Sequence, residues 1–443
     1  MASGPLASAG ATADLFPSLT IGFEFEFLII WRFDSALEGP VEIPVAGDYA
    51  IMNGYVVVNH SSLPPIRGRR TVALSKAQGE RVARRAVYEL LQANNVDIID
   101  PNSPYNPPYV ETHRNAANTR RPEYLRWDIH DDGSVLNFGR GEWSYDRAEI
   151  GAGTFYLLDV ELVSPALRAD AMDNDAEISR VLGLIKDNLM YFVPPSCGLH
   201  VHVGQGRTIF DTAHLSKIAA GFYAIDVWFK DLHPQHRLED DAFSPSTRRR
   251  SRLAEGETAA EANARATTWP APPAVDAAFG NPPELTTPTK AWQELSQASN
   301  PAAVCRLMGS KVRGTYNFSN VANLSKPTIE FRQAAGSLNE DWAINWAKLL
   351  VGLVDWARQA STMDIYTFLM EAETREASPG LNYYPLDKFV RRRLRLPDVA
   401  DYIARTSPDT RATPKLTGTQ AAWRESVVAP GLGPTMLPRP DWP

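Results

Sequence analysis

The sequence predicts an α+β fold in which an antiparallel or mixed sheet has helices covering one side. Several segments alternate polar and apolar residues with a period of two, as strands with one polar and one buried face do. Amphipathic segments of helical period separate these strands irregularly, without the regular βαβ order of a parallel sheet. The chain has 443 residues, of which 44% are hydrophobic, and this is enough to bury a large core.

The expected elements follow the chain in an irregular order. Ser75 and Gln78 make a capping-box pattern at the start of one helix, and Asn53-Gly54 suits the turn of a hairpin. Strands are expected at 20–31, 96–100, 127–136, 155–163, 197–204, 316–320 and 328–333, and helices at 75–94, 174–189, 211–232, 292–308 and 342–358.

One main domain with a tail at each end is expected. Residues 1–18 predict a flexible N-terminal tail, and residues 401–443 predict a Pro-rich C-terminal tail. The main domain between them, 19–400, has an insertion at about 234–290 that is rich in Pro, Arg and Ala. This insertion is expected to be partly disordered or loosely helical, and the basic run 248–252 within it to be solvated.

Composition excludes several classes of protein. A net charge of −7 disfavours non-specific nucleic-acid binding, which needs a basic surface. No apolar run reaches the roughly 20 residues that span a bilayer, so no membrane partner is expected. Two cysteines make no disulfide framework, and the N-terminus lacks the pattern of a secretory signal. A reducing, cytoplasmic location is therefore expected.

Three expected strands carry chemically reactive pairs at i, i+2, which places both members on one face. These pairs are Glu24 with Glu26, His200 with His202, and Glu330 with Arg332. Carboxylates suit Mg²⁺, imidazole suits a metal or phosphate, and the planar fork of arginine suits phosphate. A histidine pair alone fits a buried core site equally well, but beside two acidic strands it favours a ligand role.

Further candidates lie on neighbouring segments. Glu161 is the better ligand of its strand, and Asp159 fits a ligand or a rim position. Asp132 begins an Asp-Gly turn, which is most often only a turn. Arg313 and Asn317 are expected to contact phosphate or substrate, Arg313 as a catalytic group and Asn317 on the nucleotide.

Cys197 and the absent motifs narrow the chemistry. Cys197 lies close to His200 in sequence, yet a small buried apolar role is the favoured interpretation. The sequence has no P-loop, no H-E-x-x-H motif and no G-x-G-x-x-G turn that opens a helix after a strand. P-loop NTPases, zincins and nicotinamide enzymes are therefore disfavoured.

Five motifs together resemble a known family. They are G-F-E-F-E at 22–26, D-G-S at 132–134, V-E-L-V-S-P at 160–165, C-G-L-H-V-H-V-G at 197–204 and T-I-E-F-R-Q-A-A-G-S-L-N at 328–339. In this order they resemble the putative amidoligase family of the carboxylate–amine ligase superfamily, which is related to glutamine synthetase and γ-glutamylcysteine ligase. The resemblance covers roughly residues 20–360, without the insertion.

The resemblance implies a glutamine-synthetase-like fold: a curved, mainly antiparallel sheet with helices packed on its outer face. It implies that the concave face binds ATP and two or more Mg²⁺ ions, for which Mn²⁺ could substitute. Arg332 matches the arginine that contacts the transferring phosphate, and Asp132 a position that binds substrate or metal. The implied metal ligands are Glu24, Glu26, Glu161, His200, His202 and Glu330, and the implied nucleotide contacts are His200, His202 and Arg332.

The leading hypothesis is an ATP- and Mg-dependent carboxylate–amine ligase that forms an amide bond through an acyl-phosphate. Its substrates would be small-molecule or peptide carboxylates and amines. The sequence is compatible with a homo-oligomer and does not decide the oligomeric state. Two alternatives use the same fold. One is a metal-dependent hydrolase that works with the same Glu and His residues, and the other is a non-catalytic binding module.

Overall fold

The computed structural model describes most of the chain. The ranges described are 18–34, 47–52, 54–63, 71–100, 125–132, 135, 137–138, 143–144, 147–150, 153–171, 173–237, 244–266, 286–309, 314–321, 326–378, 385–408 and 411. Residues 1–17 of the expected N-terminal tail, Arg313, and Gly133-Ser134 of the D-G-S motif lie outside the described residues.

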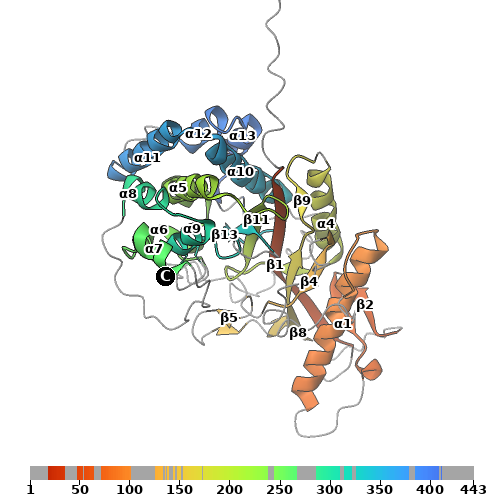
Figure 1. The fold of residues 1–443 in the computed structure, drawn as a ribbon. Coiled ribbons are helices and arrows are strands. Elements are labelled where there is room, and N and C mark those ends of the chain that lie inside the picture. The colour runs from red at the N-terminus through yellow and green to blue at the C-terminus, as the bar shows by residue number, and fades with distance from the viewer. Residues whose placement is uncertain are drawn as a thin grey trace, which may run out of the picture.

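An 11-stranded sheet forms the centre of the molecule (Figure 1). Its longest strand, β1, is flanked at Glu24 by β11 on one side and β8 on the other. Strand pairs are antiparallel throughout the described residues except for β1 with β3. The prediction of an α+β protein with a mainly antiparallel sheet is confirmed. The strands are β1 (Thr20–Phe33), β2 (Tyr49–Met52), β3 (Tyr55–Val58), β4 (Asp128–His130), β7 (Arg147–Ile150), β8 (Gly153–Val163), β9 (Leu167–Arg168), β10 (Tyr191–Phe192), β11 (Gly198–Gly204), β12 (Tyr316–Asn317) and β13 (Thr328–Ala335), with β5 (Asn137–Phe138) and β6 (Trp143–Ser144) as a separate pair.

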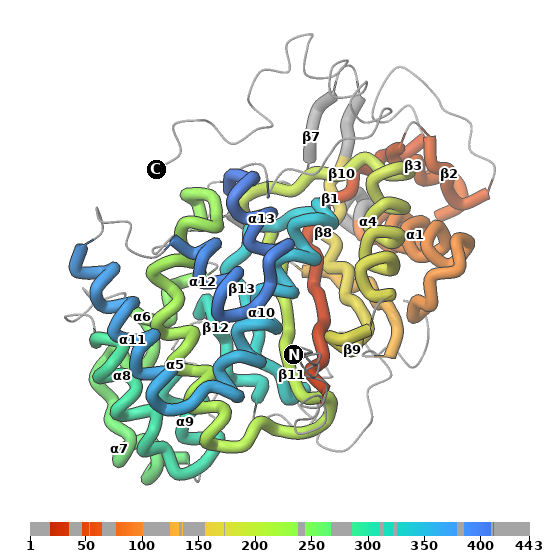
Figure 2. The backbone as a smooth tube through the Cα atoms, turned by 90° about the horizontal axis from the view of Figure 1, so that it is seen from above, coloured from red at the N-terminus to blue at the C-terminus, as the bar shows by residue number. Residues whose placement is uncertain are grey.

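Helices pack against this sheet, and Figure 2 shows α10 lying across β1, β11 and β13. The helices are α1 (Thr71–Ala93), α4 (Asn174–Asn188), α5 (Thr212–Phe229), α6 (Thr247–Arg250), α7 (Ala259–Arg265), α8 (Pro288–Leu295), α9 (Pro301–Met308), α10 (Glu340–Gln359), α11 (Thr362–Ala377), α12 (Leu386–Arg392) and α13 (Pro397–Arg405). Short 3₁₀ turns occur at η2 (His60–Ser62), η4 (Lys230–Leu232) and η5 (Gln235–Arg237). None of the helices in the described part of the chain combines the length and hydropathy that a membrane-spanning segment needs.

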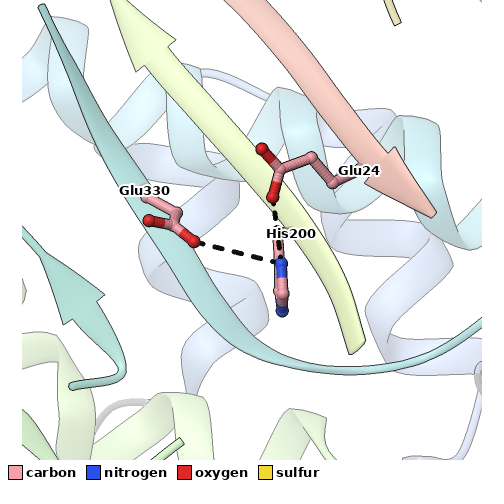
Figure 3. A group of neighbouring side chains, drawn as sticks. All are labelled: Glu24, His200 and Glu330. Atoms are coloured by element: carbon pink, nitrogen blue, oxygen red, sulfur yellow. Dashed lines mark hydrogen bonds and ion pairs between the residues drawn. The ribbon is translucent and has the colours of Figure 1, made fainter. Parts of the chain in front are cut away.

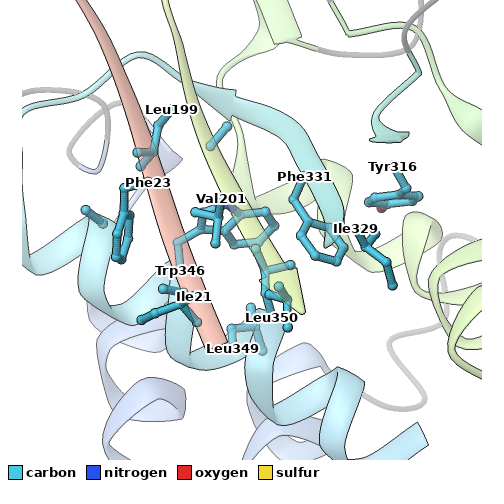
Figure 4. Packing of buried hydrophobic residues seen from close by; sticks show 14 of the residues in the cluster. Ile21, Phe23, Leu199, Val201, Tyr316, Ile329, Phe331, Trp346, Leu349 and Leu350 are labelled. Atoms are coloured by element: carbon cyan, nitrogen blue, oxygen red, sulfur yellow. The ribbon is translucent and has the colours of Figure 1, made fainter. Parts of the chain in front are cut away.

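The alternation of the strands decides which face carries the core. Ile21 and Phe23 of β1, Leu199 and Val201 of β11, and Ile329 and Phe331 of β13 all point toward α10 (Figure 4). There they pack with Trp346, Leu349 and Leu350 in one continuous hydrophobic core. The intervening polar residues of the same strands must therefore face the opposite side of the sheet.

Several local predictions need correction. Helix α1 begins at Thr71, so Ser75 lies inside the helix and cannot cap it. The expected strand 96–100 is reduced to one bridge between Ile98 and Trp127. Within the described residues of 127–136, the expected strand is limited to the short β4. The expected helix 292–308 is two helices, because Asn300 caps a new helix and Pro301 occupies its first turn.

The expected insertion is better ordered than its composition suggests. Its described residues include η5, α6, α7 and the first residues of α8, and Leu253 and Ala262 are buried. The prediction that the run 248–252 is solvated is wrong for Arg248, which is buried and forms two hydrogen bonds with Glu376. Its counter-ion lies 128 residues away in sequence, so local sequence could not reveal the pair.

Further helices follow the last helix that the sequence predicts, at 342–358. Helices α11 and α12 were not expected, and α13 runs across residue 400, where the domain was expected to end. Beyond it, Arg411 is buried and donates hydrogen bonds to the carbonyl oxygens of Leu232, Ile403 and Thr406. The chain therefore remains attached to the domain at least as far as Arg411.

Candidate active site

The polar face of the sheet brings the three predicted pairs together. On β1 and β11, Glu24 lies opposite His200, and on β11 and β13, His202 lies opposite Glu330. On the other side of β1, Glu26 lies opposite Glu161 of β8. These residues come from segments up to 306 positions apart, from Glu24 to Glu330, and antiparallel pairing aligns them.

The first cluster consists of Glu24, His200 and Glu330, contributed by three adjacent strands (Figure 3). His200 Nδ1 lies 3.2 Å from Glu24 Oε2 and 3.9 Å from Glu330 Oε1. One ligand atom from each of the three residues lies within 4.8 Å of the other two, a spacing at which they could hold one metal ion. His200 Nε2 also lies 3.5 Å from Glu26 Oε1, so this histidine joins the two sides of β1.

Two cations lie against the first cluster. Lys326 Nζ lies 2.9 Å from Glu24 Oε1, and Arg332 donates a hydrogen bond of 2.5 Å to Glu330 Oε1. Burial would raise the pKa of Glu24, but Lys326 and His202 overcome this effect and hold the pKa well below its usual value. Burial likewise opposes ionisation of Glu330, and Arg332 more than offsets it, so the Glu330 pKa is lowered. Glu24 and Glu330 are therefore ionised, and Lys326 and Arg332 largely compensate their charges.

Lys326 and Thr328 are site residues that the sequence analysis missed. His202 Nε2 lies 2.8 Å from Glu24 Oε1, and its Nδ1 lies 3.1 Å from Thr328 Oγ1, so both ring nitrogens are engaged. The sequence does contain a pattern that places them in the site. Lys326, Thr328, Glu330 and Arg332 are spaced two residues apart and so continue one face of the strand. Pro327 lies within this pattern, and because proline is unusual inside a strand, the strand was expected to begin only at Thr328.

Arg332 is largely but not fully buried, with 12% of its side chain exposed, and it keeps donor capacity. Its Nη1 lies 3.4 Å from His200 Nδ1 in addition to its bond to Glu330. Its Nε has no hydrogen-bond partner within the described part of the chain. The interior favours a partner for such a buried donor, so this atom is suited to an oxygen of a bound ligand.

Asn317 supports the same strand, since its side-chain amide donates a 2.7 Å hydrogen bond to Glu330 Oε2. It thus orients a candidate ligand. The predicted contact between Asn317 and a nucleotide stays a prediction.

The second cluster consists of Glu26, Asp132 and Glu161, each with an oxygen within 4.8 Å of the others. Glu26 Oε2 accepts a 2.5 Å hydrogen bond from the backbone N–H of Gly198. Burial raises the pKa of Glu26, with a smaller contribution from Asp132. Burial and then the charges of Glu24, Glu26 and Asp132 raise the pKa of Glu161 well above its usual value. Burial and, after it, repulsion among the carboxylates therefore both oppose ionisation in this cluster.

Asp159 belongs to neither cluster. It lies opposite Leu28 on β1, and its carboxylate lies 3.6 Å from Arg84 of α1. Of the two positions weighed for it, the structure favours the rim.

Cys197 is fully buried in a small apolar cluster with Leu28, Ile30 and Met190. Burial raises the pKa of its thiol well above the usual value, which disfavours the nucleophilic thiolate. We expect Cys197→Ala to keep at least half of the wild-type catalytic rate and to lose about 1 kcal/mol of stability from the shortened side chain. Mass spectrometry of the wild-type protein during turnover provides the check, because a trapped thioester would contradict this expectation.

The fold and the site define an α+β protein whose sheet presents two groups of carboxylates, joined by His200, on the face away from its main core. Over residues 17–354 the sequence matches the family model described as a putative amidoligase enzyme, and the chain therefore belongs to this family. A comparison with curated proteins finds no significant match.

Proposed function

We propose that the protein is an ATP- and Mg-dependent carboxylate–amine ligase with a glutamine-synthetase-like catalytic sheet. The observation that carries this proposal is the pairing of two carboxylate clusters with Arg332 on one face of the sheet. Phosphoryl transfer needs cations to neutralise phosphate oxygens and a fixed donor for the moving group. A site with both features suits that chemistry.

The donor set fits divalent cations. Oxygen ligands are preferred by Mg²⁺. The pKa of Glu161 is raised by burial and then by the like charges of Glu24, Glu26 and Asp132, and a bound cation would offset these charges. Glu26, Asp132 and Glu161 would hold one ion. Glu24, His200 and Glu330 would hold a second beside it, because His200 borders both clusters.

The residues of the chain would divide the remaining work. When bound, Mg-ATP supplies the phosphoryl group that turns an unreactive carboxylate into an acyl-phosphate. Arg332 would bind the charged oxygens of that group through donors not engaged by Glu330. His202, whose ring nitrogens are engaged by Glu24 and Thr328, would orient the Glu24 carboxylate toward the bound ion. The amine then attacks the acyl carbon, and an amide forms as phosphate leaves.

We expect Mg-ATP to raise the melting temperature more than Mg²⁺ or ATP with EDTA does. A ligand that binds only the native state stabilises it by about 2.7 kcal/mol at a hundredfold excess over its Kd. Melts of the full chain under the three conditions measure this. Stabilisation by the metal alone, with no further effect of ATP, would favour a metal-dependent hydrolase on the same residues.

Formation of ADP tests the proposed reaction class itself. A panel of carboxylates and amines is incubated with Mg-ATP, and ADP release that requires both substrates is the expected result. Phosphate release that requires neither substrate, or cleavage of an amide without nucleotide, would contradict the proposal.

A further inference from the structure

We propose that Arg237 is a positioning residue that sets the direction of Arg332, an inference that rests on the proposed function. Arg237 ends the 3₁₀ turn η5 within the segment that composition marks as an insertion. Only 2% of its surface is exposed. Its guanidinium binds the backbone of β13, the strand that carries Glu330 and Arg332.

Strand β13 has a β-bulge opposite His200. Leu199 pairs with Ala334 and Val201 pairs with Phe331, so the single residue His200 faces both Arg332 and Gln333. The parity of the strand changes at this point: Ile329 and Phe331 face the core before the bulge, and Ala334 faces it afterwards. A bulge of this kind re-aims a side chain, and here the residue at the bulge is Arg332.

Arg237 binds the backbone that the bulge displaces. Its Nη2 donates to the carbonyl oxygens of Arg332 and Ala334, both at 3.0 Å, and its Nε donates to that of Gln333 at 3.4 Å. Three successive carbonyl groups thus converge on one planar cation. Buried carbonyl groups need partners, and a disrupted ladder supplies fewer of them.

Gly198 allows this arrangement. A Cβ at Gly198 would lie 3.1 Å from Arg237 Nη2 and 2.5 Å from His200 Nε2, so both side chains pack closely over the glycine. Arg237 therefore lies next to the ring of His200 and also binds the backbone carbonyl oxygen of Arg332.

The test uses Arg237→Lys in the full chain, which keeps the charge but cannot bind three carbonyl oxygens in a plane. We expect kcat for ADP formation to fall about 10²-fold, the cost of a small displacement at a reacting centre, while KM for Mg-ATP changes less than about threefold. The double variant Arg237→Lys/Arg332→Lys should be no slower than Arg332→Lys alone, because both changes remove the same function. Additive losses, or a normal kcat in Arg237→Lys, would overturn the proposal.

Arg411 offers a matched control. It is also a buried arginine whose guanidinium binds backbone carbonyl oxygens, at 2.8–3.0 Å, but none of these belongs to β13. Arg411→Lys should lower the melting temperature about as much as Arg237→Lys and leave kcat unchanged. Equal losses of kcat in both variants would reduce Arg237 to a general structural role.

Hydrogen exchange separates this inference from the proposed function. If the wild-type protein forms no ADP, peptides that cover β13 still report its order. Arg237→Lys should speed exchange in these peptides by tenfold or more, and Arg411→Lys should not. Unchanged exchange in Arg237→Lys would overturn the positioning role even if ligase activity were found.

Discussion

Arg332→Lys should lower the rate of ADP formation about 10²–10³-fold, a loss of about 3–4 kcal/mol in transition-state stabilisation. Lysine keeps a positive charge beside Glu330 but loses the planar fork and the Nε donor that has no partner in the described residues. Because the pair with Glu330 survives, we expect the melting temperature to change by only a few degrees. Steady-state kinetics and a thermal melt of the same sample measure both effects.

Two further variants bracket this result. Arg332→Met leaves Glu330 buried without its cation and should cost about 3–5 kcal/mol of stability as well as activity. Arg248→Lys changes another buried ion-paired arginine, one bound to Glu376 outside the site, and should keep the wild-type rate. Near-normal turnover by Arg332→Lys would show that the Arg332–Glu330 contact is only a salt bridge.

Glu161→Gln should make the metal-free protein more stable by about 1 kcal/mol and remove most of its stabilisation by Mg²⁺. Glutamine keeps the shape of the side chain but removes one of three charges that repel one another. Melts in EDTA and in Mg²⁺ measure the two effects. Asp159→Asn, on the same strand but paired with Arg84, is the matched control and should leave the Mg²⁺ response intact.

The same carboxyl group predicts a pH dependence. Because the pKa of Glu161 is raised in the folded protein, the folded state binds this proton more tightly than the unfolded state does. Its contribution to stability is therefore present below the ordinary pKa of 4.5 and is lost as the pH rises through the folded value. The stability gained by Glu161→Gln in EDTA should grow as the pH rises from about 4.5. A gain that shrinks over this range would contradict the electrostatic description of the second cluster.

Much of the site could be predicted because period-two patterning is local. A spacing of two residues on a strand is enough to predict that two side chains share a face. This spacing holds for Glu24 with Glu26, His200 with His202, and Glu330 with Arg332, and strand pairing then aligns the three pairs. Asp132 was harder to place, because it lies beyond the end of β4 and is brought to Glu161 by the pairing of β4 with β8. Its motif suggested a site residue but could not say which cluster it joins.

What the sequence could not reveal depends on tertiary pairing. The bulge at Arg332 changes the parity of β13 without any glycine or proline to announce it. Arg237 and Arg248 lie in a segment whose composition suggests disorder, yet both are buried. Arg237 donates hydrogen bonds to backbone carbonyl oxygens of β13, and Arg248 donates them to the distant Glu376. Such contacts join residues about 95 and 128 positions apart, beyond the reach of any local pattern.

The central claim is that ATP activates a carboxylate as an acyl-phosphate, and oxygen transfer tests it most directly. Once ADP formation has identified a carboxylate and an amine, the carboxylate is labelled with ¹⁸O at both oxygens and the released phosphate is analysed by mass spectrometry. The proposal predicts one ¹⁸O in the phosphate and one in the amide product. Phosphate that carries no label from the carboxylate, and takes its new oxygen from water, would contradict it.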